Sequence, residues 1–153
     1  MQKVTLTILS LILLTGFCFT TVPAQGRYRG RSYNKADVNR IIQRVEDSSD
    51  SLRKAVDANL DHSRLDGTRR EDNINEQVKQ LESALDDLRR EFDRHDTWRE
   101  TRREVERVMR QSDEINAIFH RQHFHAAVEA RWRIVRADLN KLPGIYELPL
   151  LRA

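Results

Sequence analysis

Hydrophobic residues recur at steps of three and four positions from residue 34 onward, and charged residues fill most of the positions between them. In an α-helix this spacing gathers the hydrophobic side chains on one face, whereas a half-buried strand needs them at every second position. A helix with one hydrophobic stripe and charged remaining faces is stable chiefly when that stripe packs against another helix. The sequence therefore predicts an all-α fold built from packed amphipathic helices.

Four successive stripes can be followed, and their residues form the predicted core. Substitutions on a stripe, for example at Leu85 or Leu139, should destabilise the fold, whereas changes at Arg89 or Glu82 should have little effect because these residues lie off the stripes. The stripes consist of Val38, Ile41, Val45, Ser49, Leu52, Val56 and Leu60; Ile74, Val78, Leu81, Leu85, Leu88 and Phe92; Trp98, Val105, Met109, Ser112, Ile115 and Phe119; and Phe124, Val128, Trp132, Val135, Leu139 and Leu142.

Local signals place the helix boundaries in the middle of the chain. Residues 61–67 are mostly polar and predict a loop after the first stripe. Two capping boxes follow, Thr68 with Glu71 and Thr97 with Glu100. In such a box each side chain accepts a hydrogen bond from the other residue's backbone N–H, so each box marks the start of a helix.

The boundary between the third and fourth stripes falls in residues 119–125, which contain no glycine or proline. An unbroken helix over residues 98–142 would be about 68 Å long, and most of its stripe would have no partner in a monomer. We therefore predict a turn in this segment and an antiparallel helical bundle of four helices in one domain. The alternative is a longer, coiled-coil assembly that is complete only as a homodimer.

The beginning of the chain, residues 1–24, has the layout of a signal peptide. One lysine precedes an uncharged hydrophobic run over residues 4–19, and Val22 and Ala24 suit the −3 and −1 positions of a cleavage site. The run is shorter than the roughly 20 residues that span a bilayer, and a bulky residue before Cys18 disfavours lipidation there. We expect an exported protein, periplasmic or secreted, that has no transmembrane segment and no cysteine after cleavage.

Both ends of the mature chain differ from the helical centre. Residues 25–33 contain three arginines and two glycines without hydrophobic periodicity, which predicts a flexible basic arm ahead of the bundle in residues 34–153. Such an arm can bind anionic lipid or wall polymers, although a solubilising tail has the same composition. Pro143-Gly144 should end the last helix, and the hydrophobic residues 145–153 should fold back as an extended strap or serve as a docking peptide.

The charges are nearly balanced, with 27 Lys and Arg against 24 Asp and Glu, so net charge predicts no nucleic-acid partner. Acids outnumber bases in residues 46–76, whereas bases outnumber acids after residue 115. This asymmetry can orient a molecule at a charged surface, but solvated helix faces produce it as well.

Surface ion pairs with i,i+4 spacing are expected between Asp86 and Arg90, Glu106 and Arg110, and Glu129 and Arg133.

The sequence contains no glycine-rich phosphate loop, no Gly-x-Ser-x-Gly and no His-Glu-x-x-His. Nearly all of its carboxylates lie off the stripes, where solvation gives them no catalytic leverage. Neither an enzyme nor a cofactor is therefore predicted, and a haem site is disfavoured because Met109 has no histidine expected opposite it. The expected function is a non-enzymatic binding or scaffold module of the cell envelope, whose partner is a protein or an envelope surface.

Three histidines in the predicted turn, His120, His123 and His125, form a candidate metal site. Neutral imidazole binds zinc or copper well, and a secreted chain without thiols depends on such ligands. On a helix His120 and His123 lie one turn apart, and Glu129 can complete or orient the ligand set. The alternative function is therefore a metal-binding periplasmic protein, although histidine is also an ordinary residue for a polar turn.

A pattern of large residues marks the end of the last stripe and the segment after it, Trp132-x-x-Val135-Arg136-x-Asp138-Leu139-Asn140-x-Leu142-x-x-x-Tyr146-x-Leu148. This pattern resembles the endings of small exported helical proteins of bacteria that have no assigned function. The resemblance implies export and a helical fold. It implies no activity and identifies no functional residue.

Overall fold

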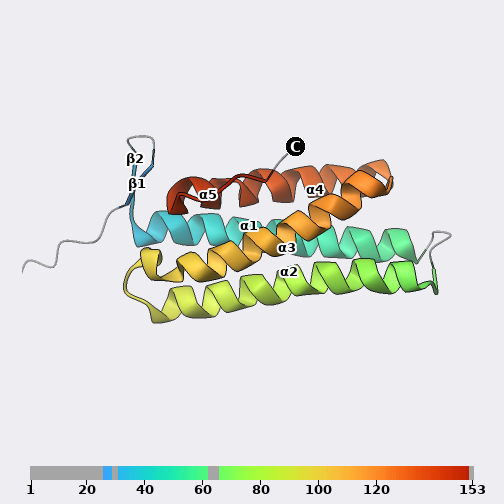
Figure 1. The fold of residues 1–153 in the computed structure, drawn as a ribbon, viewed down its shortest axis with the longest axis horizontal. Helices are drawn as coiled ribbons and strands as arrows, with labels where there is room; N and C mark the ends of the chain where they lie inside the picture. The colour runs from blue at the N-terminus through green and yellow to red at the C-terminus, as the bar shows by residue number, and fades with distance from the viewer. Residues whose placement is uncertain (1–25, 29–30, 62–65, 152–153) are drawn as a thin grey trace, which may run out of the picture.

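The computed structural model describes residues 26–28, 31–61 and 66–151. Within these ranges four long helices run alternately up and down and pack side by side (Figure 1), which confirms the predicted all-α, antiparallel bundle. The helices are α1 (Lys35–Leu60), α2 (Arg69–Arg94), α3 (Arg102–Arg121) and α4 (Ala126–Leu139). The shorter elements are β1 (Gly26–Tyr28), β2 (Arg31–Tyr33), the 3-10 helix η1 (Trp98–Thr101) and α5 (Lys141–Tyr146).

Two closely packed helix pairs make up the bundle. Backbone contacts are most numerous between α2 and α3 and between α1 and α4. Helix α3 runs obliquely across the view, from the end of α2 to the start of α4 (Figure 1). The first and last long helices therefore form one layer, and the two middle helices form the other.

The hydrophobic stripes meet between the helices, as the sequence predicted, and the residues of the second and fourth stripes are all buried. The first stripe differs at one position, because Ile42 is fully buried whereas Ile41 is only partly buried. From Val38 to Val45, the route through Ile41 takes a step of three and then of four, and the route through Ile42 takes a step of four and then of three. Both routes stay on one face of a helix. Spacing alone therefore does not distinguish the two isoleucines.

The third stripe buries a wider face than predicted. Val108 and Ile118 belong to the core, whereas Phe119 is only partly buried. The ring of Phe119 stacks on Trp132, with 5.3 Å between centroids, and lies 4.5 Å from the ring of Phe124. Helix α3 thus packs against α2 and, through these rings near its C-terminus, also against α4.

Helix α1 begins with a complete capping box. Asn34 Oδ1 accepts the backbone N–H of Asp37 at 2.9 Å, and the Asp37 carboxylate accepts the N–H of Asn34 at 3.2 Å. The hydrogen bond from the Asn34 backbone, together with that from Arg40, holds the pKa of Asp37 below its ordinary value. This box fixes the start of α1 next to the N-terminal hairpin.

Of the two predicted capping boxes, the first forms in a modified way. Thr68 Oγ1 accepts the N–H of Glu71 at 3.3 Å, but the Glu71 carboxylate accepts the N–H of Gly67, at 2.6 Å, in place of that of Thr68. Gly67 has a φ of 70°, a left-handed conformation that glycine adopts without strain. The turn before α2 therefore depends on this glycine as well as on the threonine.

The second predicted box, Thr97 with Glu100, is not formed. The Thr97 hydroxyl donates to the Glu100 carboxylate at 3.0 Å, so the two side chains bond to each other and neither caps the backbone. The chain begins this segment as the 3-10 helix η1 and becomes α-helical at Arg102. The sequence thus correctly predicted that a helical segment begins here, but the predicted capping hydrogen bonds are absent.

The chain turns between α3 and α4, as predicted from the length that an unbroken helix would have. Gln122 has extended backbone angles and ends α3, and its N–H donates to the carbonyl of Ile118 at 2.9 Å. Helix α4 begins at Ala126. Residues 122–125 therefore reverse the chain, although they contain neither glycine nor proline.

Helix α5 corrects the prediction for the C-terminal segment. Pro143-Gly144 does not end the helical region, because both residues lie inside α5. A new helix begins at Lys141, and a proline in its first turn is tolerated because the N–H groups there have no intrahelical acceptor. Tyr146, which was predicted to lie in the extended strap, is the last residue of this helix.

Tyr146 attaches α5 to the start of α3. Its hydroxyl lies 2.9 Å from Thr101 Oγ1, and its carbonyl accepts a hydrogen bond from the Arg102 guanidinium at 2.7 Å. Its ring meets that of Trp98 edge-on, with 5.1 Å between centroids. Burial raises the pKa of Tyr146 to about 12, so the hydroxyl remains protonated and available for this contact.

Residues 147–151, hereafter the strap, run back along the bundle after α5. Glu147 ends α5 in a left-handed conformation, with a φ of 57°. Asn140 holds the far end of the strap, since its Oδ1 accepts the N–H of Leu151 at 2.8 Å and its Nδ2 donates to the Leu151 carbonyl at 3.3 Å. Leu151 is buried, but Leu150 is 54% exposed. The strap begins two residues later than predicted, and Glu147 and Leu151 are both held in place; residues 152–153 of the predicted strap lie outside the described residues.

The N-terminal strands β1 and β2 pair antiparallel, with Arg27 opposite Ser32. They lie in residues 25–33, which were predicted to be a flexible basic arm. The structure differs from this prediction in that these residues contain two short paired strands. The carbonyl of Tyr33 accepts a hydrogen bond from Trp98 Nε1 at 3.3 Å, which holds the end of the hairpin against η1. The predicted signal peptide, Cys18 and the cleavage site lie outside the described residues.

Arg89 lies off the hydrophobic stripes, as predicted, but it also forms contacts between two helices. Its guanidinium donates to both carboxylate oxygens of Glu46 on α1, at 3.0 and 2.7 Å, and also to Asn39. Both charged side chains are largely covered, with exposed fractions of 24% and 27%. The hydrogen bond to Glu46 raises the pKa of Arg89. This bidentate pair links α1 to α2.

Replacing Leu85 or Leu139 by alanine should lower the free energy of unfolding by about 2–5 kcal/mol, because both side chains are buried and truncation leaves a cavity. The control Gln43→Ala, at an exposed position of α1, should change it by less than about 0.5 kcal/mol. Urea denaturation followed by circular dichroism measures all three variants. Equal losses at core and control positions would show that the stripes do not form the core.

A double-mutant cycle on Arg89→Ala and Glu46→Ala should give a coupling energy of about 1–2 kcal/mol, because the pair is bidentate and half-buried. The pair Arg94 and Glu91, at 2.9 Å within α2, is the control because Arg94 is 63% exposed and the contact is not bidentate, and it should couple by about 0.3–0.5 kcal/mol. Denaturation of the single and double variants provides both values. Equal coupling in the two pairs would contradict the structural role of Arg89.

Candidate functional site

The three histidines that were predicted as metal ligands lie at the turn between α3 and α4. His120 is in the last turn of α3, His123 lies between the helices, and His125 is the N-cap of α4; all three are exposed. His125 Nδ1 accepts the backbone N–H of Ala127 at 3.3 Å. One nitrogen of this imidazole therefore already serves to cap α4.

The structure does not gather these side chains around one point. In the part of the chain that it describes, no group of three or more His, Cys, Asp or Glu side chains is placed to hold a metal ion. Glu129, the suggested additional ligand, lies in the first turn of α4. Binding of zinc or copper by His120, His123 and His125 stays a prediction.

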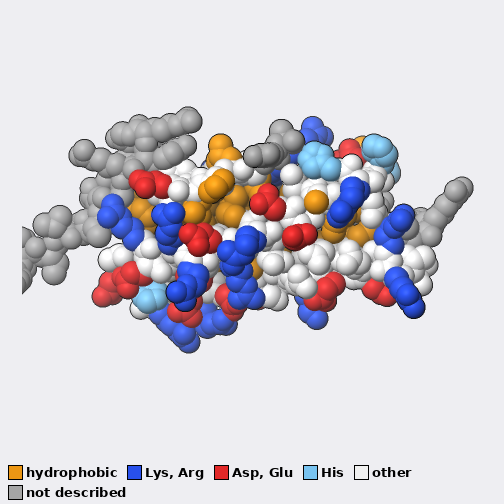
Figure 2. Space-filling model, viewed as in Figure 1, with side chains coloured by type: hydrophobic (Ala, Val, Ile, Leu, Met, Phe, Trp, Pro, Cys, Tyr) orange, Lys and Arg blue, Asp and Glu red, His pale blue; other side chains and the backbone are white. Residues whose placement is uncertain are grey.

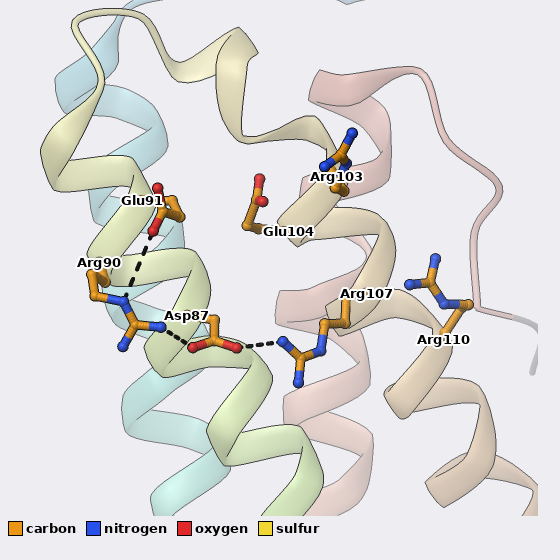
Figure 3. Close-up of a pocket in the computed structure, with 7 residues that line it drawn as sticks. All are labelled: Asp87, Arg90, Glu91, Arg103, Glu104, Arg107 and Arg110. Carbon is orange, nitrogen blue, oxygen red and sulfur yellow. Dashed lines mark hydrogen bonds and ion pairs between the residues drawn. The ribbon is translucent and has the colours of Figure 1, made fainter.

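A charged pocket of about 310 Å³ lies between α2 and α3, near the C-terminus of α2 and the N-terminal half of α3 (Figure 3). We call it the arginine pocket. Four guanidinium groups and three carboxylates line it, so positive charge exceeds negative charge. The lining residues are Asp87, Arg90 and Glu91 from α2, and Arg103, Glu104, Arg107 and Arg110 from α3.

Helical geometry brings the three α3 arginines together. Arg103, Arg107 and Arg110 are separated by steps of four and three, which place them along one side of a helix. Close packing of α3 against α2 then sets this row opposite the charged residues near the end of α2. The pocket therefore exists only because two separate helices are adjacent.

Asp87 neutralises part of this positive charge. Its two carboxylate oxygens accept hydrogen bonds from Arg90 on the same helix and from Arg107 across the pocket (Figure 3). Arg90 Nε also lies 3.9 Å from a carboxylate oxygen of Glu91. Arg90 and Arg107 are thus positioned by partners within the protein.

The other two arginines of the pocket remain available to a ligand. Arg103 and Arg110 are exposed, and neither forms an ion pair or hydrogen bond with a residue that the structure describes. The carboxylates of Glu91 and Glu104 lie toward one end of the pocket, whereas Arg110 lies toward the other (Figure 3). Among the residues that line this pocket, the end near Arg110 is therefore the more positive one.

A pocket of this composition can bind anions. Guanidinium groups are charged at every physiological pH, and their paired N–H donors match the geometry of carboxylate and phosphate oxygens. Each bidentate contact adds direction to the electrostatic attraction. The arrangement thus suits recognition of a phosphate or carboxylate group at the protein surface.

The sequence did not predict this pocket, partly because the ion pairs that it suggested are formed differently. Glu106 pairs with Arg102, at 3.1 Å, and does not pair with Arg110. Arg90 pairs with Asp87 rather than with Asp86. A signal was nevertheless present, since one face of α3 carries an arginine at each turn.

Acidic residues gather in a different groove, of about 700 Å³, between α1 and α2. They include Asp57, Asp72, Glu76, Glu82 and Asp86. Burial raises the pKa of Glu82 above its ordinary value. Helix α2 thus separates an acidic groove shared with α1 from the arginine pocket shared with α3, a division that the distribution of charge along the sequence did not predict.

None of the helices in the described ranges is both long enough and hydrophobic enough to cross a membrane. The chain matches no known protein family, no curated protein and no solved structure at a significant level.

If the histidine cluster binds metal, zinc or copper titrated at pH 7.5 should bind with sub-micromolar affinity. The binding should disappear at pH 5.5, because protonated imidazoles cannot act as ligands. The double substitution His120→Ala with His123→Ala should abolish it, and His95→Ala, at the far end of α2, serves as the control. Equal binding by the wild type and the double variant in calorimetry would eliminate this site.

Proposed function

We propose that the protein is a non-enzymatic binding or scaffold module of the cell envelope that holds an anionic partner in the arginine pocket. The observation that carries this proposal is the pair of exposed arginines, Arg103 and Arg110, which have no ionic partner among the described residues. Asp87 holds Arg107 beside them. A phosphate or carboxylate group from a partner would complete the charge balance of the pocket.

The architecture supports binding more readily than catalysis. The lining of the pocket consists of arginines and carboxylates, with no histidine, lysine, serine or threonine among the described lining residues. Arginine is a poor proton donor because its guanidinium stays charged in proteins. Arginine-rich surfaces commonly hold anionic groups through multiple hydrogen bonds.

The envelope location rests on the sequence. The layout of residues 1–24 predicts export, and the pattern that ends at Leu148 resembles the endings of exported helical proteins. Phosphate and carboxylate groups are abundant on membrane headgroups and wall polymers, so an exported anion-binding module has many candidate surfaces. A bundle with interhelical links such as Arg89 to Glu46 provides a stable support for such a surface.

The proposal predicts that the purified protein binds tripolyphosphate, a simple multivalent anion, and that Arg103→Ala with Arg110→Ala weakens this binding by about tenfold or more. Each lost charge-assisted hydrogen bond contributes on the order of 1.5 kcal/mol, and 1.4 kcal/mol corresponds to a factor of ten. Isothermal titration calorimetry at low and moderate salt measures the affinities. Binding should weaken as salt increases.

The matched control is Arg131→Ala with Arg133→Ala, which removes two exposed arginines from α4 and changes the net charge equally. Its affinity for tripolyphosphate should stay within about twofold of the wild type, because only the general field of the protein changes. Circular dichroism checks that both variants remain helical. Equal weakening in the two variants would show that the pocket has no special role in anion binding.

A further inference from the structure

A second, more hydrophobic groove of about 310 Å³ adjoins the arginine pocket. It lies between α3 and the strap, and we call it the strap groove. Met109 forms part of one wall, and Leu148, Pro149 and Leu150 form the other. Figure 2 shows hydrophobic side chains at the surface of this face, beside a group of Lys and Arg side chains.

Arg110 belongs to both cavities, since it lines the arginine pocket and the strap groove. In Figure 3 its side chain lies between Arg107 and the chain that follows α5. A ligand with a charged end at Arg110 can therefore extend a hydrophobic part along the strap without leaving the surface.

The strap groove has hydrophobic surface that the fold itself does not cover. Leu150 is 54% exposed and, with Ile134, is one of two large hydrophobic residues exposed in the described part of the chain. Leu150 is exposed although the backbone beside it is fixed, because Asn140 holds the next residue, Leu151, by two hydrogen bonds. Covering Leu150 with a hydrophobic ligand would remove this surface from water.

The backbone of the strap is poorly suited to pairing with an extended peptide. The N–H of Leu148 donates to the carbonyl of Pro143 at 2.9 Å, and the N–H of Leu151 donates to Asn140. Pro149 has no N–H. Recognition of a peptide by strand addition needs a series of free backbone groups, whereas an acyl chain needs only hydrophobic contact.

Two carboxylates also line the strap groove, Glu106 and Asp113. Glu106 pairs with Arg102 at 3.1 Å, so its charge is balanced. Asp113 is exposed, one helical turn beyond Arg110. It would repel a second negative group placed along the groove, which favours a ligand that has its negative charge at one end only.

We propose that the arginine pocket and the strap groove together bind a lipid that has a single anionic headgroup, with the headgroup at Arg110 and an acyl chain along Leu148, Pro149 and Leu150. This inference rests on the proposed function, because it names the class of anion that the arginine pocket takes. Charge complementarity at Arg110 and the adjacent hydrophobic wall select such a ligand over a simple anion or a neutral detergent.

Three probes separate the contributions of charge and chain: ethyl phosphate, dodecyl phosphate and dodecyl maltoside, each kept below its micelle concentration in calorimetry with the full protein. Dodecyl phosphate should bind at least about tenfold more tightly than ethyl phosphate, because each buried methylene adds affinity. It should also bind at least about tenfold more tightly than dodecyl maltoside, which has the same chain without the charge. Arg110→Ala should remove the advantage over dodecyl maltoside.

Leu150→Ser should weaken binding of dodecyl phosphate by several-fold and leave ethyl phosphate unchanged. The control Ile134→Ser alters a similarly exposed residue on α4, which is 50% exposed, and should leave both affinities unchanged. Neither side chain is part of the core, so both variants should fold.

The outcomes distinguish this inference from the function on which it rests. Equal affinity for ethyl and dodecyl phosphate, with binding still lost in the Arg103 and Arg110 variant, would overturn the lipid site and leave the anion-binding module intact. Binding of dodecyl phosphate that no arginine substitution affects would overturn both proposals. Tighter binding of an acidic, leucine-containing peptide than of dodecyl phosphate would also overturn the lipid assignment and indicate a protein partner.

Discussion

Burial of one hydrophobic stripe on each long helix is the constraint on which the rest of this structure depends. The faces outside the stripes are strongly charged, so the stripes can be removed from water only by meeting one another. Pairing α1 with α4 and α2 with α3 achieves this and requires a chain reversal after each helix. The reversal at residues 122–125 follows from this requirement even without a helix-breaking residue, since a continuous helix would leave half of its stripe exposed.

The spacing of hydrophobic residues predicted the helices and most of the core, because buried positions recur every three to four residues along a helix and this repeat is visible in the local sequence. It failed where two arrangements satisfy the same period, as with Ile41 and Ile42, and where tertiary contacts decide the local conformation. Pro143 illustrates the second case. A proline normally ends a helix, but here it lies in the first turn of α5, which Tyr146 holds in place through Thr101 and Trp98. No local pattern could show that those partners would be present.

The candidate site was less predictable than the fold, because it depends on which charged faces come together. The histidines of the predicted metal site lie close in sequence, yet they do not form a group of three or more metal ligands in the described structure. The arginine pocket combines residues from two helices, and its ion pairs cross between them, as Arg107 does to Asp87. From the sequence, a carboxylate three residues from an arginine and one four residues away are equally good candidates for an ion pair. The packing of the helices therefore decides which arginines are paired.

The strap connects the packing of the bundle to its surface chemistry. Leu151 is buried and Asn140 binds its backbone on both sides, so the position of the strap is set by the core beneath it. Fixing Leu151 in this way obliges Leu148, Pro149 and Leu150 to pass beside Met109 and Arg110. At this position Leu150 leaves hydrophobic surface in contact with water, which a polar residue would not do. A hydrophobic wall next to a guanidinium that pairs with no described residue is an arrangement in which a ligand with both a charged and a hydrophobic part gains from each contact. Because Asn140 already holds the end of this wall in the folded protein, less order has to be imposed when such a ligand binds.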